Sequence, residues 1–159
     1  MDERKKEGRY RRIHTQLEEL TKKSGDPIAR MATICAVLHH KMDHFFWTGF
    51  YLLKAEGNSA TEKLVVGPYQ GPVACQELEP RKGVCWAAVD RSEPVLVKDV
   101  HSFPGHIACD SRSQSEITLP VKDSSGKIKA VFDVDSDKSG SFSEVDRAYL
   151  QQIMELVYR

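Results

Sequence analysis

Three acidic side chains fall on one face of a predicted β-hairpin. Residues 127–134 alternate in the manner of a strand, and Asp133 and Asp135 share one of its faces. The turn sequence Asp-Ser-Ser-Gly joins this strand to an earlier one at residues 116–122. A four-residue loop would pair Glu116 with Asp133, and a two-residue loop would pair it with Asp135. Either register groups the three carboxylates, and only an odd-numbered loop would separate them.

Three like charges across a strand ladder are unfavourable unless something compensates them. The face could be fully hydrated, with its charges screened by water. A cation, such as a ligand amine or a metal ion, could instead lie among the carboxylates, or at least one carboxyl could stay protonated. The last two alternatives predict a cationic ligand beside a carboxylic acid that can donate a proton near neutral pH.

Three of the four cysteines lie in segments that we expect to be loops or irregular, although the segment over residues 72–92 could hold a short helix after Gly83. Cys75, Cys85 and Cys109 are 10 and 24 positions apart, and none belongs to a Cys-x-x-Cys pair. Redox chemistry needs a nucleophilic thiolate and a second thiol that resolves the oxidised sulfur, which such cysteines could supply. A zinc site made by His101, His106 and Cys109 is the alternative, although structural zinc sites usually contain a closely spaced cysteine pair.

The fourth cysteine and most of the aromatic residues are explained by a hydrophobic core. Cys35 falls within the apolar stripe of a helix predicted to begin at Asp26-Pro27, so we expect it to be buried. Trp47 opens an aromatic run that ends at Tyr51. We single out Trp47, because an aromatic wall beside carboxylates suits a small zwitterion or a polarisable sulfur group.

Helices at both ends of the chain flank the strands that carry these residues. Residues 1–25 predict a charged helix with one apolar stripe, and Ser143 with Asp146 forms an approximate capping box for a last helix. The strands predicted between the helices are residues 45–54, 64–66, 94–97, 116–122 and 127–134. This order predicts an α+β fold, with an antiparallel sheet of about five to six strands.

Composition sets the class of protein. The chain has 159 residues, with 23 lysines and arginines against 23 aspartates and glutamates, so we expect a single domain over residues 1–159 and no bulk attraction of nucleic acid. No run of about 18 uncharged apolar residues occurs, and the start of the chain is too charged for a signal peptide. We therefore expect a cytoplasmic protein without membrane contact, in which permanent disulfides are not expected.

A set of short motifs occurs in a fixed order. The motifs are Trp47-Thr48-Gly49-Phe50-Tyr51, Gly67-Pro68-Tyr69-Gln70-Gly71, Ala74-Cys75, Gly83-Val84-Cys85, Asp99-Val100-His101, Pro104-Gly105-His106-Ile107-Ala108-Cys109-Asp110, Ser115-Glu116-Ile117 and Asp133-Val134-Asp135-Ser136. Together they resemble the free methionine-(R)-sulfoxide reductases, which are built on a GAF domain, over about residues 45–150. The resemblance implies a GAF-like fold and reduction of free L-methionine (R)-sulfoxide to methionine with electrons from thioredoxin. It implies no bound cofactor and no metal.

The resemblance also implies roles for the three cysteines. Cys109 would attack the sulfoxide sulfur, and Cys85 and Cys75 would supply the resolving thiol. Which of Cys109 and Cys85 attacks first stays open at this point. One departure from the family pattern follows Cys85, where Trp86 stands in place of a small residue that is commonly glycine.

The acidic and aromatic residues would form the substrate pocket. By resemblance, Glu116, Asp133 and Asp135 would bind the substrate ammonium and assist protonation of the departing oxygen. Trp47 and Tyr51 would face the methyl and thioether part of the substrate.

The competing hypothesis is a GAF sensor that binds a small ligand without catalysis, because this fold serves many functions. A sensor has no need of three cysteines at these positions, which favours the enzyme. The charged helix over residues 1–25 lies outside the matched region, so the resemblance gives it no role. It could pack between two copies of the chain, and a homodimer is therefore an open alternative.

Overall fold

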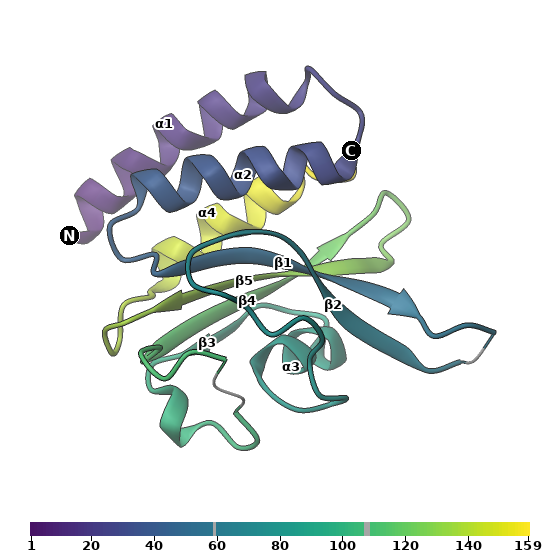
Figure 1. Cartoon of the computed structure of the whole chain (residues 1–159). Coiled ribbons are helices and arrows are strands. Elements are labelled where there is room, and N and C mark those ends of the chain that lie inside the picture. Colours follow the sequence, from purple (N-terminus) through teal and green to yellow (C-terminus); the bar gives the residue numbers. More distant parts are fainter. Residues whose placement is uncertain (59, 107–108) are drawn as a thin grey trace.

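The computed structural model describes residues 1–58, 60–106 and 109–159, and helices cover both faces of one sheet in it (Figure 1). Ile107 and Ala108, which belong to the motif around Cys109, lie outside the described residues. The elements are α1 (Glu3–Thr21), α2 (Pro27–Lys41), β1 (Trp47–Ala55), β2 (Glu62–Gln70), α3 (Val84–Arg91), β3 (Val95–Val97), the 3-10 helix η1 (Val100–Ser102), β4 (Ser115–Lys122), β5 (Ile128–Ser136) and α4 (Glu144–Met154). The strand order is β2-β1-β5-β4-β3 and all neighbours are antiparallel, which confirms the predicted α+β class.

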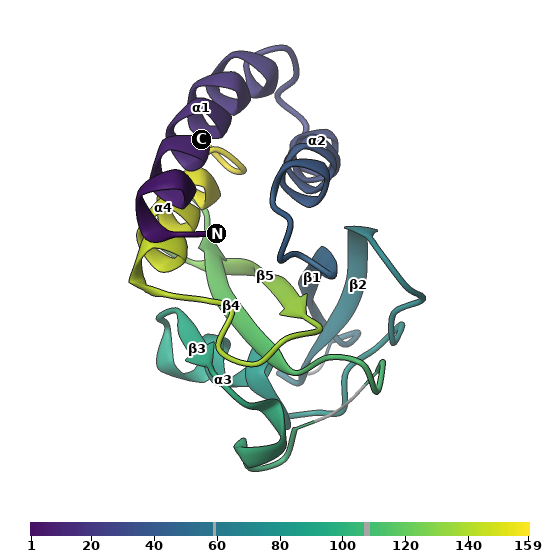
Figure 2. The same ribbon diagram turned by 90° about the vertical axis from the view of Figure 1, so that its left-hand side faces the viewer.

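The helices α1, α2 and α4 pack together on one face of the sheet (Figure 2). Asp26 caps α2 by accepting hydrogen bonds from backbone N–H groups of its first turn, and Pro27 begins the helix, as the sequence predicts. Cys35 is buried in this core. The spacing of Ile28 and Cys35 predicts that Ile28 belongs to the same apolar stripe, which is wrong, because Ile28 is 47% exposed and the buried face of α2 passes through Ile34 instead.

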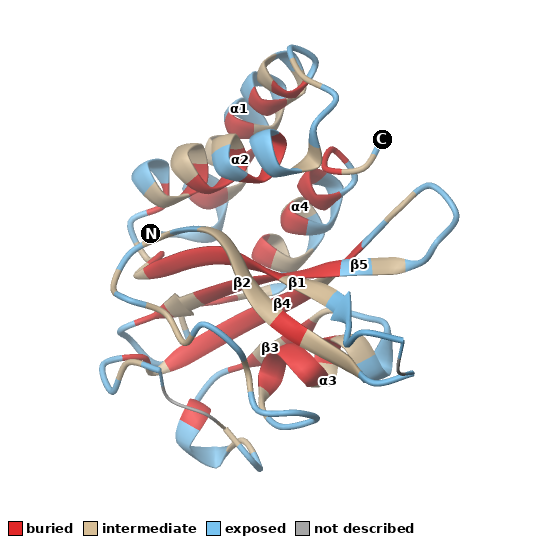
Figure 3. Ribbon diagram, turned by 45° about the vertical axis from the view of Figure 1, so that its right-hand side comes forward, coloured by how far each residue is buried: buried red, intermediate tan, exposed pale blue. Residues whose placement is uncertain are grey.

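The opposite face carries a second, smaller apolar cluster that lies under α3 and the long loops. Buried residues are concentrated along the central strands, and exposed residues on the loops and turns (Figure 3). Trp86 is buried in this cluster, and the Arg81 guanidinium lies 4.5 Å from the centre of its ring. The indole therefore fills the space between α3 and the sheet, as a core residue would. No helix of the described residues is long and apolar enough to cross a bilayer.

The β4–β5 hairpin adopts one of the two registers that the sequence left open. Glu116 pairs with Asp135, while the loop itself, residues 124–126, has an odd length. A bulge at Lys129 compensates for the odd loop length. Lys122 pairs with Ile128, but the next pair is Val121 with Ala130, so Lys129 has no partner in the ladder. The bulge restores the predicted outcome, with the acidic side chains of both strands on one face.

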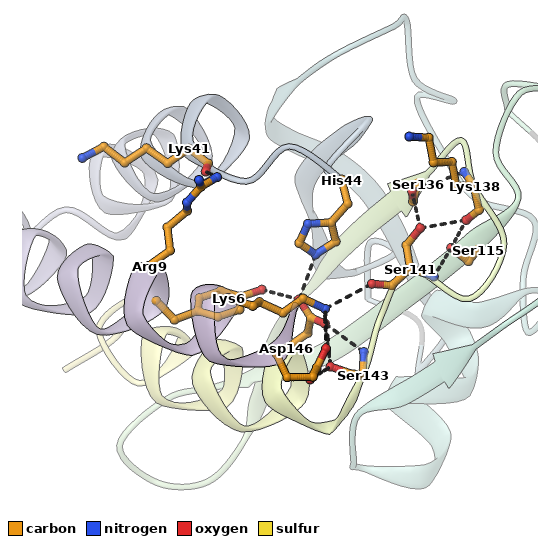
Figure 4. A network of polar contacts seen from close by, with 12 residues as sticks. Lys6, Arg9, Lys41, His44, Ser115, Ser136, Lys138, Ser141, Ser143 and Asp146 are labelled. Carbon is orange, nitrogen blue, oxygen red and sulfur yellow. Dashed lines mark hydrogen bonds and ion pairs between the residues drawn. The ribbon is translucent and has the colours of Figure 1, made fainter. Parts of the chain in front are cut away.

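A buried carboxylate ties α1 to α4 (Figure 4). Asp146 accepts hydrogen bonds from Lys6 Nζ at 2.7 Å and Tyr10 Oη at 2.6 Å, and His44 Nε2 lies 2.9 Å away. It also completes the predicted capping box with Ser143. Burial would raise the pKa of Asp146, but hydrogen bonds from His44, Lys6 and Tyr10 outweigh burial and hold the pKa at about 2.

Candidate active site

A cavity of about 50 Å³ lies on the face of the sheet that bears α3. Seven of the eight residues that the sequence singled out line it, and they are Trp47, Tyr51, Cys85, Cys109, Glu116, Asp133 and Asp135. The eighth, Cys75, adjoins the cavity through a disulfide bond to Cys109. The fold therefore brings together residues that are far apart in the sequence.

The carboxyl groups come from two neighbouring strands and are largely withdrawn from solvent. Glu116 of β4 and Asp133 of β5 are each 6% exposed, and Asp135 is half-buried beside them. Asp133 lies against Glu116 and Cys85, and one donor atom from each of the three side chains lies within 4.8 Å of the other two. Two buried carboxylates this close repel each other, which favours a proton on one of them. The face is not a hydrated one, so that alternative from the sequence is wrong.

The surroundings raise the pKa of all three carboxyl groups. Burial raises the pKa of Glu116 to about 8, and the charge of Asp135 adds to the effect. The pKa of Asp133 rises through burial and then through the charge of Glu116, and that of Asp135 through burial and then the charge of Asp133. Without a cation among them, Glu116 stays mostly protonated at neutral pH.

The structure corrects the expected surroundings of Cys85. It is the second residue of α3, the short helix that the sequence allowed after Gly83, and it is 4% exposed, whereas we expected a loop-like thiol open to reaction. Burial raises the pKa of its thiol, followed by the charges of Asp133, Glu116 and Asp135. Cys85 is therefore held as a neutral thiol at the floor of the cavity.

Cys75 and Cys109 form a disulfide that joins the loop after β2 to the loop before β4. Their Cα atoms are 5.5 Å apart, and 34 positions separate them in the chain. This pairing is incompatible with the alternative zinc site, because the sulfur of Cys109 is bonded to Cys75 and His101 is exposed. His106 instead lines the cavity, with Nε2 3.6 Å from Glu116 Oε2.

Trp47 forms an aromatic wall with two tyrosines. Its ring stacks on Tyr51 at 5.7 Å and on Tyr69 at 5.3 Å between centroids, and its Nε1 donates a hydrogen bond to Pro72 O at 3.0 Å. Gly49 is required here, because a Cβ atom at this position would collide with Trp47 and Tyr69. The wall is thus fixed by hydrogen bonding, stacking and the missing side chain of one glycine.

The sequence did not assign Tyr69, His106 or Ser113 to the pocket. Tyr69 stacks on Trp47, and Ser113 lines the cavity together with Asp135. His106 lies three residues before Cys109, and this spacing suggested only a role as a zinc ligand. Each of these contacts joins segments that are distant in the sequence.

Comparison with known proteins agrees with this geometry. The GAF domain family matches residues 27–158. The chain is 43% identical over 152 residues to GAF domain-containing protein A of Dictyostelium discoideum, covering 96% of this chain and 92% of that protein. It is 39% identical over 127 residues to the free methionine-R-sulfoxide reductase of Escherichia coli, covering 80% and 73% of the two chains.

A solved structure supports the same relationship. The free methionine-R-sulfoxide reductase of Neisseria meningitidis, in complex with its substrate, superimposes with a TM-score of 0.84 at 37% identity, covering 93% of this chain and 85% of that one. The matched region includes the cysteine pair, the carboxyl cluster and the aromatic wall of this chain. This chain belongs to the GAF-domain family of free methionine-R-sulfoxide reductases.

Proposed function

We propose that the chain acts as one domain that reduces free L-methionine (R)-sulfoxide to L-methionine through a cysteine sulfenic acid and a disulfide. The observation that carries the proposal is the convergence of a disulfide-forming pair, Cys75 and Cys109, on the cavity that contains the buried carboxyls. Reduction of a sulfoxide needs both a thiol and an acid at the same sulfur atom. The cavity supplies both.

Cys109 is the attacking residue in this proposal. Its thiolate attacks the sulfoxide sulfur and forms a sulfur–sulfur bond. The protonated oxygen then passes to the Cys109 sulfur, and the sulfur–sulfur bond breaks with its electron pair left on methionine, which is released and leaves a sulfenic acid on Cys109. The thiol of Cys75 then condenses with the sulfenic acid, which forms the disulfide and expels water. Cys85 is a poorer nucleophile, because burial and three neighbouring acids raise the pKa of its thiol.

Glu116 is the proton donor to the departing oxygen. A sulfoxide oxygen is a poor leaving group until it is protonated, and a pKa of about 8 keeps the Glu116 carboxyl protonated at neutral pH. Asp133 and Asp135 bind the substrate ammonium, whose positive charge favours their ionised forms. Trp47 and Tyr51 face the methyl and thioether part, where stacked rings offer an apolar surface.

The same carboxyl groups explain selection of the free amino acid. A free ammonium satisfies buried carboxylates by charge and hydrogen bonds, whereas the uncharged nitrogen of a peptide bond leaves them unpaired. Methionine sulfoxide within a protein is therefore a poor substrate.

An external dithiol returns the enzyme to its reduced state, and thioredoxin is the reductant that we propose. The disulfide joins two loops at the cavity, and Val73 beside it is 84% exposed, so a protein dithiol can approach. This chemistry needs no bound cofactor and suits the cytoplasm, where dithiol reductants are available.

The test is an NADPH-coupled assay with thioredoxin and thioredoxin reductase, run on the free R epimer, the free S epimer and a peptide that contains the R epimer. We expect NADPH oxidation with the free R epimer alone. Cys109→Ser should abolish turnover, and the matched change Cys35→Ser, at a buried thiol outside the cavity, should leave it intact. Folded protein that is silent on all three compounds would contradict the proposal and favour a ligand-binding GAF module.

A further inference from the structure

We propose that Cys85, Glu116 and Asp133 form a binding site for a thiophilic divalent cation, with Zn²⁺ as the ion of best fit, and that this ion inhibits the enzyme. The ion would occupy the floor of the cavity, where the carboxyls bind the substrate ammonium in the proposed function. Binding of the ion depends only on the three side chains, whereas its inhibitory effect rests on that proposed function.

The geometry brings one donor atom from each of three elements to a common point. Cys85 comes from α3, Glu116 from β4 and Asp133 from β5, and their donor atoms all lie within 4.8 Å of one another. Zinc binds sulfur at about 2.3 Å and carboxylate oxygen at about 2.0–2.2 Å, so ligand atoms around one ion are roughly 3–4 Å apart. Small side-chain adjustments therefore let one ion contact all three.

A second observation indicates that this floor is built to hold a cation. Oδ1 of Asp133 is fully buried and has no hydrogen-bond partner among the described residues. A buried acceptor without a partner is costly, and a ligand that supplies positive charge removes the cost. Asp133 lines the cavity, so this oxygen is available to a ligand there.

The type of donor selects the ion. A thiolate is a soft ligand that favours zinc over magnesium and calcium, which prefer six or more oxygen atoms. Cys85 and Glu116 carry protons while the site is empty, and a bound divalent cation would displace these protons to solvent and offset the repulsion among the resulting thiolate and carboxylates. His106, whose Nε2 lies 3.6 Å from Glu116, offers a nitrogen donor at the edge of the site.

This site differs from the histidine and cysteine set that the sequence suggested. The sulfur of Cys109 is bonded to Cys75, but Cys85 is a free thiol in the same structure. The site is thus complete while the redox pair is oxidised. Zinc can therefore bind without competing with disulfide formation, and it can hold the enzyme in a form that does not accept substrate.

The experiment uses untagged, full-length protein with the Cys75–Cys109 disulfide intact and no thiol reductant present. Cys85 and Cys35 are then the remaining thiols. Titration with Co²⁺ should produce a thiolate-to-metal charge-transfer band and intense visible bands, which report sulfur ligation and four-coordination. Competition with Zn²⁺ against a chromophoric chelator should give one ion per chain.

The variants separate this site from non-specific binding. Cys85→Ser should abolish the charge-transfer band and weaken zinc binding by at least about 100-fold, since even indirect partners of metal ligands contribute about 10–100-fold. Cys35→Ser, the same change at a buried thiol in the other core, should keep both signals. Absence of the band in the wild-type protein, or zinc binding unchanged by Cys85→Ser, would overturn the inference.

The inhibitory effect is tested separately with reduced enzyme and a phosphine reductant. Zinc should raise the apparent KM for methionine sulfoxide and leave the extrapolated kcat unchanged, because ion and ammonium use the same carboxyls. A fall in kcat at constant KM would contradict competition at this site. If the protein binds Co²⁺ through Cys85 but reduces no methionine sulfoxide, the metal site stands and the proposed function fails.

Discussion

The substitution Glu116→Gln should make the protein more stable relative to the wild type as the pH rises. Glu116 has a pKa of about 8 in the folded protein and 4.5 as its ordinary value, because burial disfavours the charged form. The unfolded wild-type chain therefore releases this proton above pH 4.5, whereas the folded protein keeps it up to about pH 8. The contribution of this group to stability is complete below pH 4.5 and is lost as pH rises toward 8.

The size of the effect follows from the two pKa values. Each pH unit within this window costs about 1.4 kcal/mol, so the wild-type protein has lost about 3 kcal/mol from this group by pH 7. Glutamine does not titrate and avoids the loss. For a chain of this length, about 3 kcal/mol corresponds to roughly 6–12 °C in Tm. The Tm difference between Glu116→Gln and the wild type should therefore be larger by this amount at pH 7 than near pH 4.5, in favour of the variant.

The assay is urea unfolding, followed by tryptophan fluorescence, of both proteins between about pH 4.5 and pH 8 with the disulfide intact. Glu93→Gln, which removes an exposed carboxyl, is the matched control for the substitution itself. A stability difference between Glu116→Gln and wild type that stays constant over this range would refute the argument. It would mean that Glu116 is not buried as a neutral acid.

Three further outcomes follow from the site and the core. Cys75→Ser should release about one methionine per chain and then stop, with a sulfenic acid on the enzyme that mass spectrometry detects after trapping with a carbon nucleophile. Gly49→Ala should lower the free energy of unfolding by about 1–3 kcal/mol and raise KM, because the new methyl group displaces Trp47; unfolding and steady-state kinetics measure the two effects. Asp146→Asn should lower the free energy of unfolding by about 3–5 kcal/mol near neutral pH, because it removes the buried anion of Lys6 at 2.7 Å and leaves only the exposed carboxylate of Glu3 at 3.5 Å. This difference in the free energy of unfolding should shrink as the pH falls from 3.8 toward 2, because Asp146 of the wild type becomes protonated in that range. Denaturant unfolding at several pH values measures it.

Alternation along one strand was enough to predict the acidic face. Asp133 and Asp135 must share a side in any regular strand, and an even difference in register brings Glu116 to it. The sequence could not choose between the two registers, because the choice depends on the bulge at Lys129. A bulge is fixed by twist and packing of the sheet, and the residues 123–129 carry no motif that requires one.

The contacts between loops could not be predicted from spacing. Cys75 and Cys109 are 34 positions apart, and the chain between them passes through α3, β3 and η1 before it returns to the cavity. The burial of Cys85 could not be predicted for a related reason, because an eight-residue helix without a side-chain cap leaves a weak periodic signal. Long-range packing over the sheet decides both features.

Most hydrogen-bond partners of Asp146 in the core could not be predicted from spacing either. The capping box with Ser143 was predictable because its partners are three residues apart. Lys6 and His44 are 140 and 102 positions away, and only the packing of α1 and α2 against α4 brings them to the same carboxylate.

The hydrogen bonds of Asp146 bear on where the chain can be truncated. The match to the GAF domain family begins at residue 27, so a shortened version starting there would still contain the whole matched domain. It would lack Lys6 and Tyr10, and it would uncover the apolar side of the two helices on which α1 packs. Expression, domain grafting and circular permutation of this protein should therefore treat α1 as part of the folding unit, with the hydrogen bonds of Asp146 as the guide to its boundary.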